Sequence, residues 1–328
     1  MKLLKNFLRP VKRHFSAHRD IEWLKQKEVN DYKSPKVNLG QIQSRQNAQK
    51  RIGADFSEIE FQVFSQFGDD GIIQWFVSNL PFQNKTFIEF GVEDYREANT
   101  RFLLVNNYWS GFVIDGDSAN IASHERERLS NFFDIVGMAS FITKDNINDL
   151  MRSSGFGGPV DILSVDIDGN DYWVWKAIDS IDPILIICEY NCLFGFESSY
   201  TVPYEADFVR GRNGPFSLYG TSLLSANDLA ESRGYTFVGC NSAGNNAYFL
   251  KSNWLQHLPK SPVTLAEGFR FSSFSETRNE NGRIVRGADR VRHLEGLPVV
   301  NTRSMREEPF NSKAIIQSLQ EHKKLARY

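Results

Sequence analysis

The sequence predicts an α/β fold built on a doubly wound, mostly parallel sheet. Between residues 85 and 189, short apolar segments alternate with helical segments, as in successive strand–helix–strand units. The short segments are apolar on both faces, which is typical of parallel strands that helices cover on two sides. Two further apolar segments, 234–239 and 246–250, predict an antiparallel strand pair that closes the sheet.

Five strands are expected in the alternating region, over residues 85–91, 109–115, 133–142, 160–165 and 183–189. The helices between them are expected over residues 99–106, 121–132, 147–153 and 172–178. A helix over 70–80 precedes the first strand, with Asp69 or Asp70 placed to cap it and Pro81 directly after it. A long insertion follows the fifth strand, and the last helices are expected over 222–233 and 312–326.

The 328 residues are expected to form three regions. Residues 1–55 are a basic or polar leader that is partly helical, and core packing is expected to begin near Phe56. Residues 56–258 form the domain that holds the sheet and the site. Residues 259–328 form a polar extension that packs on this domain.

The first part of the leader has apolar side chains at helical spacing, with Lys and Arg between them. Such a helix could lie on an anionic membrane or dock on a partner. Packing on its own domain is the alternative, and Pro10 breaks a long continuous helix. The sequence contains neither an apolar run of about 18 residues nor a continuous secretory core. We therefore expect a cytoplasmic protein, and peripheral membrane contact through residues 1–15 stays open.

The composition excludes some function classes. Lys and Arg number 38 and Asp and Glu number 40, so the basic excess of a general nucleic-acid binder is missing. Cys188, Cys192 and Cys240 are too few for a disulfide framework and lack zinc-site spacing. We expect them to be small buried side chains in a reducing compartment. No feature of the sequence indicates an oligomeric state.

Four of the predicted strands end in carboxylates. In an open α/β sheet, ligands bind at the carboxyl ends of the strands, where the strand order reverses. The residues expected there are Glu89 and Gly91, then Asp115, then Asp166 and Asp168, and finally Glu189 and Asn191. Clustered carboxylates repel one another, so this edge of the sheet is expected to bind a cation or a cationic ligand. A dinucleotide is disfavoured, because the glycine-rich turn G-x-G-x-x-G is absent.

Two of these acidic positions have structural alternatives. Asp115 could accept hydrogen bonds from the two hydroxyls of an adenosine ribose, or it could cap the following helix. Asp171 is expected to cap the helix that follows the fourth strand. A calcium loop of the EF-hand type is excluded, because Ala177 stands where its last glutamate would be.

The acids after the fourth and fifth strands point to chemistry. One of the two aspartates, Asp166 or Asp168, could act as general base towards a hydroxyl group. Oxygen ligands of the kind that Mg²⁺ or another hard divalent cation prefers are offered by Asp166, Asp168, Glu189 and Asn191. A cation there could acidify a bound hydroxyl group. Both interpretations stay open at this point.

Several segments together resemble the FkbM-like methyltransferases. The segments are Ser65-Gln66-Phe-Gly68-Asp-Asp-Gly71, Phe87-Ile-Glu-Phe-Gly91, Trp109-Ser-Gly-Phe-Val-Ile-Asp115, Asp161-Ile-Leu-Ser-Val-Asp-Ile-Asp-Gly169, Tyr219-Gly-Thr-Ser-Leu-Leu and Asn245-Asn-Ala-Tyr-Phe. The resemblance covers roughly residues 58–255. It departs from the family pattern in Glu89-Phe-Gly-Val-Glu93, which stands for a Gly-Ala-Asn type of turn, and in Asp166-Ile-Asp-Gly169, which stands for Asp-Val-Glu-Gly.

The resemblance implies a class I methyltransferase fold, a Rossmann-like sheet of seven strands in the order 3-2-1-4-5-7-6, with S-adenosylmethionine as methyl donor. Carried over, Glu89 and Gly91 line the methionine part of the cofactor and Asp115 holds its ribose. Asn146, with Lys144 and Asp145 nearby, flanks the adenine, and Asp166 is also expected to contact the cofactor. The methyl-transfer site is faced by Asp166, Asp168, Glu189 and Asn191, and this strand-four and strand-five pairing is also similar to metal-dependent O-methyltransferases.

The leading hypothesis is an S-adenosylmethionine-dependent O-methyltransferase that acts on a sugar, a glycan or another small hydroxyl substrate. One alternative is a binding or scaffold protein without catalysis on the same fold, and another is an NAD-dependent oxidoreductase or epimerase.

Two other segments have two possible roles each. Ser65 to Asp70 could cover the cofactor or cap a helix, and the Arg-rich stretch 270–292 could bind an acidic substrate or be solvated loop charge.

Overall fold

The computed structural model describes residues 33–126, 129–212, 214–261 and 263–325. The amphipathic helix predicted within residues 1–15 lies outside these described residues. Among the helices that are described, none has the length and apolar character needed to span a membrane.

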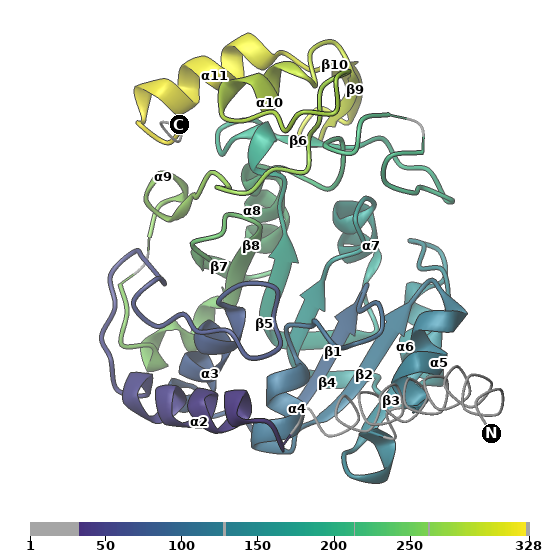
Figure 1. Ribbon diagram of the computed structural model, residues 1–328, viewed down its shortest axis with the longest axis vertical. Coiled ribbons are helices and arrows are strands. Elements are labelled where there is room, and N and C mark those ends of the chain that lie inside the picture. Colours follow the sequence, from purple (N-terminus) through teal and green to yellow (C-terminus); the bar gives the residue numbers. More distant parts are fainter. Residues whose placement is uncertain (1–32, 127–128, 213, 262, 326–328) are drawn as a thin grey trace, which may run out of the picture.

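A seven-stranded sheet forms the centre of the molecule (Figure 1). Its strand order is β3-β2-β1-β4-β5-β8-β7, and β8 runs in the direction opposite to the other six strands. Without β6, which belongs to another sheet, this is the order 3-2-1-4-5-7-6, so the predicted fold class is confirmed. The strands are β1 (Thr86–Phe90), β2 (Ser110–Asp115), β3 (Ile135–Ala139), β4 (Gly158–Val165), β5 (Ile181–Glu189), β7 (Tyr235–Cys240) and β8 (Asn246–Lys251).

Helices cover both faces of the sheet, which explains why the strands are apolar on both sides. One face packs on α3 (Asp69–Asn79), α4 (Arg101–Asn107) and α5 (Ser118–Arg126). The other face packs on α6 (Ile147–Ser153), α7 (Asp171–Ala177) and α8 (Leu223–Ser232). Neighbouring residues of one strand accordingly enter different cores: Phe87 lies in the first and Ile88 in the second.

Core packing begins earlier than Phe56, where the sequence analysis placed it. Helix α2 (Pro35–Asn47) contacts α3 and α4 and buries Val37 in a cluster with Phe102. A Cβ on Gly40 would lie 2.4 Å from Val63 Cγ2, so this helix is seated closely. The polar composition of the segment concealed this contact, because few apolar side chains carry it.

The insertion and the C-terminal extension form a second sheet above the first. Strands β6 (Tyr200–Thr201), β9 (Pro298–Asn301) and β10 (Arg306–Pro309) are antiparallel, in the order β10-β9-β6. The short helices α9 (Leu265–Gly268) and α10 (Ala288–Arg292) and the last helix, α11 (Ser312–Glu321), complete the extension, whose colour changes from green at α9 to yellow at α11 in Figure 1. None of these three strands was predicted, and the last helix ends five residues before the predicted position 326.

The site is shaped by a close contact between the ends of β1 and β4. Gly91 follows β1 with a φ of 69°, and its N–H donates to the carbonyl of Ile114 at 2.9 Å. A Cβ at this position would lie 1.8 Å from the carbonyl oxygen of Asp166. Only glycine fits here, because any side chain would clash with the backbone at the end of β4. The contact between the two strands, and not only the approach of a ligand, therefore explains the glycine.

We expect Gly91→Ala to lower the free energy of unfolding by about 3 kcal/mol. A side chain in the left-handed region costs about 1–2 kcal/mol and overpacking costs about 1–3 kcal/mol. Urea-induced unfolding measures the loss. The matched control is Gly157→Ala, where no atom lies within 4 Å of an added Cβ. Equal stability of the two variants would contradict the contact.

Candidate active site

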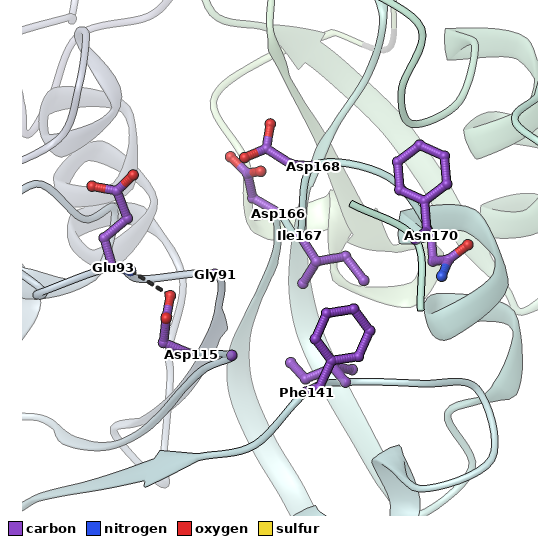
Figure 2. Close-up of a pocket in the computed structure, with 11 residues that line it drawn as sticks. Gly91, Glu93, Asp115, Phe141, Asp166, Ile167, Asp168 and Asn170 are labelled. Carbon is purple, nitrogen blue, oxygen red and sulfur yellow. Dashed lines mark hydrogen bonds between the residues drawn. The ribbon is translucent and has the colours of Figure 1, made fainter. Parts of the chain in front are cut away.

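A pocket of about 160 Å³ opens at the carboxyl ends of β1, β2 and β4. This is the point where the order of the sheet reverses, between β1 and β4. Figure 2 shows Glu93 and Asp115 on one side, and the carboxylates of Asp166 and Asp168 close together on the other. The lining residues are Gly91, Glu93, Asp115, Gly116, Phe141, Ile142, Asp166, Ile167, Asp168, Asn170 and Phe208.

Asp115 is placed at the pocket wall by the end of β2. Its carboxylate accepts from the N–H of Glu93 at 2.8 Å, the N–H of Asp117 at 2.8 Å and the side chain of Asn120 at 3.0 Å. A carboxylate offers about four acceptor positions, so roughly one remains for a ligand. Asp115 therefore combines the two roles that the sequence left open, because it orders the loops around it and also faces the pocket.

Glu89 does not reach the pocket, which corrects its predicted role in binding the cofactor. It lies within β1, and strand alternation turns it to the face that α3, α4 and α5 cover. There Oε1 accepts from the N–H of Asn99 at 2.8 Å, and Oε2 accepts from the N–H of Thr100 at 2.9 Å and from its hydroxyl group at 2.5 Å. Burial raises the pKa of Glu89 to about 7. The acid that lines the pocket is Glu93, four residues later, where the chain has left the strand.

Asn146 also lies outside the pocket lining. Its Oδ1 accepts from the N–H of Thr143 at 2.8 Å, and its Nδ2 donates to the carbonyl of Phe141 at 2.9 Å. The side chain thus ties the loop after β3, and the pocket is lined instead by Phe141 and Ile142 of the same loop. Lys144, also expected near the adenine, lies over the ring of Tyr204 at 4.2 Å.

Asp166, Asp168 and Glu189, called here the acid trio, come together from β4, the turn after it and β5. One oxygen from each lies within 4.8 Å of the others. Glu189 is 7% exposed, and its Oε2 has no hydrogen-bond partner among the described residues. Burial and the neighbouring carboxylates raise the pKa values of Asp166 and Glu189 well above their usual range. The predicted convergence of these strand ends therefore occurs.

Asn191 is not available in the way that the sequence analysis expected. Its Oδ1 accepts from the N–H of Leu193 at 3.0 Å, and its Nδ2 donates to the carbonyls of Ser217 and Tyr219 at 2.9 and 3.0 Å. These bonds fix the start and the end of the insertion. We therefore remove Asn191 from the candidate metal ligands.

Arg210, which the sequence analysis did not select, contacts the acid trio. Its guanidinium donates to Asp168 and to Glu276, and it lies 3.8 Å from the centroid of the Tyr219 ring. Asp168 has a φ of 55°, a backbone conformation that non-glycine residues rarely adopt. No motif surrounds Arg210, and only the fold of the insertion brings it to β4.

The remaining acids of the motifs are structural. Asp171 accepts from the N–H groups of Ile167 and Gly169 at 2.7 and 2.9 Å, which holds the turn from β4 into α7. Asp70 accepts from the backbone N–H of Val63, Phe64 and Ser65 at 2.7–2.8 Å. Asp69 accepts from side chains that include the hydroxyl of Tyr248 at 2.5 Å. These acids thus order loops and helix starts.

Two arginines of the Arg-rich stretch 270–292 donate to carbonyl groups of the chain itself. Arg290 is buried and donates to the carbonyl of Ser272 at 3.0 Å, and Arg270 donates to the carbonyl of Glu267 at 2.7 Å. Arg283 and Arg286 are exposed. The three cysteines are all buried and free, as predicted.

No protein-family model and no curated protein matches the chain. Solved structures that resemble it include an S-adenosylmethionine-dependent methyltransferase from Clostridium acetobutylicum, with 12% identity, 56% of this chain and 89% of that chain covered, and a TM-score of 0.36. A Staphylococcus aureus protein described as a caffeoyl-CoA O-methyltransferase has 15% identity, 71% and 100% coverage and a TM-score of 0.37. An O-methyltransferase family protein from Burkholderia thailandensis has 11% identity, 66% and 70% coverage and a TM-score of 0.33. Such values assign neither family nor substrate.

The buried carboxyl group of Glu89 predicts a pH-dependent stability. Its pKa in the folded protein, about 7, exceeds the ordinary value of 4.5, so the stabilisation present below pH 4.5 is lost as the pH rises through 7. This loss is on the order of 3 kcal/mol. Because Gln cannot ionise, Glu89→Gln should remove this fall between pH 5 and pH 8 in urea unfolding. Glu97→Gln, at an exposed position, is the control and should keep the wild-type profile. A wild-type profile in Glu89→Gln would refute the assignment.

Proposed function

We propose that the protein is an S-adenosylmethionine-dependent methyltransferase that methylates a hydroxyl group of a sugar, a glycan or another small molecule. The observation that carries the proposal is the acid-lined pocket at the reversal point of a sheet with the order 3-2-1-4-5-7-6. A ligand with hydroxyl groups and a positive charge suits such a pocket, and S-adenosylmethionine carries both. Its sulfonium group would supply the methyl group.

The cofactor would lie between the ends of β1 and β2. Asp115, with one acceptor position left, and Glu93, whose side chain borders the same space, would accept from the ribose hydroxyls. Phe141 and Ile142 would pack on the adenine ring. The methionine part would run along Gly91 towards Asp166. This path would direct the methyl group to the acid trio.

The acid trio supports the chemistry of the acceptor. Asp166 has a raised pKa, which brings it closer to the working range of a general base. Asp166 or Asp168 would take the proton of the acceptor hydroxyl while the pocket aligns this oxygen with the methyl group. Phe208 borders the acceptor side and would exclude water.

The trio also fits a divalent cation. Oxygen ligands at about 2.1–2.6 Å from one ion lie within about 5 Å of one another, as these three do. The unpartnered Oε2 of Glu189 is an oxygen that such an ion would satisfy. A cation held there would lower the pKa of a bound hydroxyl group.

Binding of S-adenosylhomocysteine, measured by calorimetry, tests the cofactor. We expect binding by the wild type, none of NAD, and about 10- to 100-fold weaker binding by Asp115→Ala, because hydrogen bonds to a charged group are lost. Glu93→Gln should weaken binding without changing stability. Asp149→Ala, at an exposed position on α6, is the control. Absence of binding at millimolar ligand would leave a scaffold protein as the better description.

Transfer of a labelled methyl group to a panel of sugars and phenols tests the base. Asp166→Asn should keep the affinity for S-adenosylhomocysteine and lower transfer by about 100-fold or more, because the proton acceptor is lost. Undiminished transfer would exclude Asp166 as base.

Chelation by EDTA tests the cation separately: full activity in EDTA removes the cation from the proposal and leaves the methyl transfer in place.

A further inference from the structure

Arg210 connects the insertion to the acid trio through hydrogen bonds and is held firmly by its neighbours. All three nitrogens of its guanidinium are engaged: Nε donates to the carbonyl of Phe216 at 2.8 Å, Nη1 to Asp168 and Nη2 to Glu276. The centroids of the Phe216 and Tyr219 rings lie 4.2 and 3.8 Å from its Cζ. The side chain is only 12% exposed. A group with so many partners holds its neighbours in place and does not swing freely.

Glu276 offsets the charge that Arg210 brings. The pair of Arg210 and Glu276 is formally neutral, so the pair adds no net positive charge beside the trio. Arg210 also reaches only the outermost member, Asp168, whose side chain is 57% exposed. Deeper in the cluster, Oε2 of Glu189 stays buried without a partner among the described residues. The inner part of the trio, next to Oε2 of Glu189, is therefore a position that a cation could occupy.

Asp168 is the member of the trio that needs an external support. Its backbone is in the left-handed region and its side chain is largely exposed, whereas Glu189 is held by burial. Its Oδ1 accepts from Arg210, and in the part of the chain that is described no donor is found for its Oδ2. Arg210 therefore fixes one carboxylate oxygen of Asp168, and the other oxygen is left for a ligand.

We propose that Arg210 is the positioning residue of a divalent-cation site formed by Asp166, Asp168 and Glu189, a proposal that rests on the cation considered above. The arginine orients the carboxylate of Asp168, and Glu276 cancels its charge so that the cation is not repelled. Hydrogen bonds to metal-ligating side chains commonly raise metal affinity by about 10- to 100-fold. Arg210 thereby makes the insertion part of the site.

Binding of Mn²⁺ alone, measured by electron paramagnetic resonance and calorimetry, tests the role of Arg210 without an acceptor. We expect Arg210→Gln to bind Mn²⁺ about 10- to 100-fold more weakly than the wild type. Arg210→Lys should not restore the affinity, because one ammonium group cannot span both carboxylates as the planar fork does. Arg212→Gln is the matched control: it lies two residues later and pairs with the exposed Asp207 at 3.3 Å. Its affinity should equal that of the wild type.

The sign of the change decides between orientation and repulsion. Unchanged or tighter Mn²⁺ binding by Arg210→Gln would overturn the proposal, because Arg210 would then be a bystander or a competing charge. A wild type that does not bind Mn²⁺ would overturn it too, while S-adenosylhomocysteine binding by the same sample still decides the methyltransferase proposal. If Arg210→Gln does not fold, Glu276→Gln replaces it. This variant leaves the arginine charge unbalanced and should lower the affinity several-fold; an unchanged affinity would contradict the proposal.

Discussion

The contact between the Gly91 backbone and the Asp166 carbonyl is the constraint on which the site depends. It brings the ends of β1 and β4 together where the order of the sheet reverses, and both residues line the pocket. Asp115 and Glu93 stand on one side and Asp168 on the other. A wider separation of the two strands would take the carboxylates apart, and the pocket would lose the concentrated negative charge that distinguishes it.

The buried acids of this protein differ in what surrounds their carboxylates. Asp70, Asp171 and Glu89 accept from backbone N–H groups and fix loops and helix starts, while burial raises the pKa of each. Oε2 of Glu189 and Oδ1 of Asp70 have no partner among the described residues, and the Glu189 carboxylate also lies beside those of Asp166 and Asp168. A buried polar atom without a partner costs about 1–3 kcal/mol, a cost that the proposed cation would offset at Glu189.

How far the sequence could predict the structure depended on how local each signal was. The five parallel strands are apolar on both faces, so their positions and the convergence of Asp166, Asp168 and Glu189 followed from sequence alone. Strands β9 and β10 were not predicted because they are short, and β10 lacks the alternation of apolar and polar residues that marks a strand. Glu89 was misplaced because an acid inside a strand faces a helix layer, whereas an acid past its end, Glu93, faces the pocket. Arg210 had no local signal, since its partners are distant in the sequence.

The pairing of β6 with β9 has a consequence for the order in which the chain can fold. β6 lies directly before the segment that carries Arg210, and its partners in β9, Val300 and Asn301, are about a hundred positions further along. During synthesis the strands of the large sheet are complete long before this partner leaves the ribosome. The hydrogen bonds of Asn170 and Asn191 to the insertion can therefore form early, whereas the pairing of β6 with β9 is added only when almost the whole chain has been made.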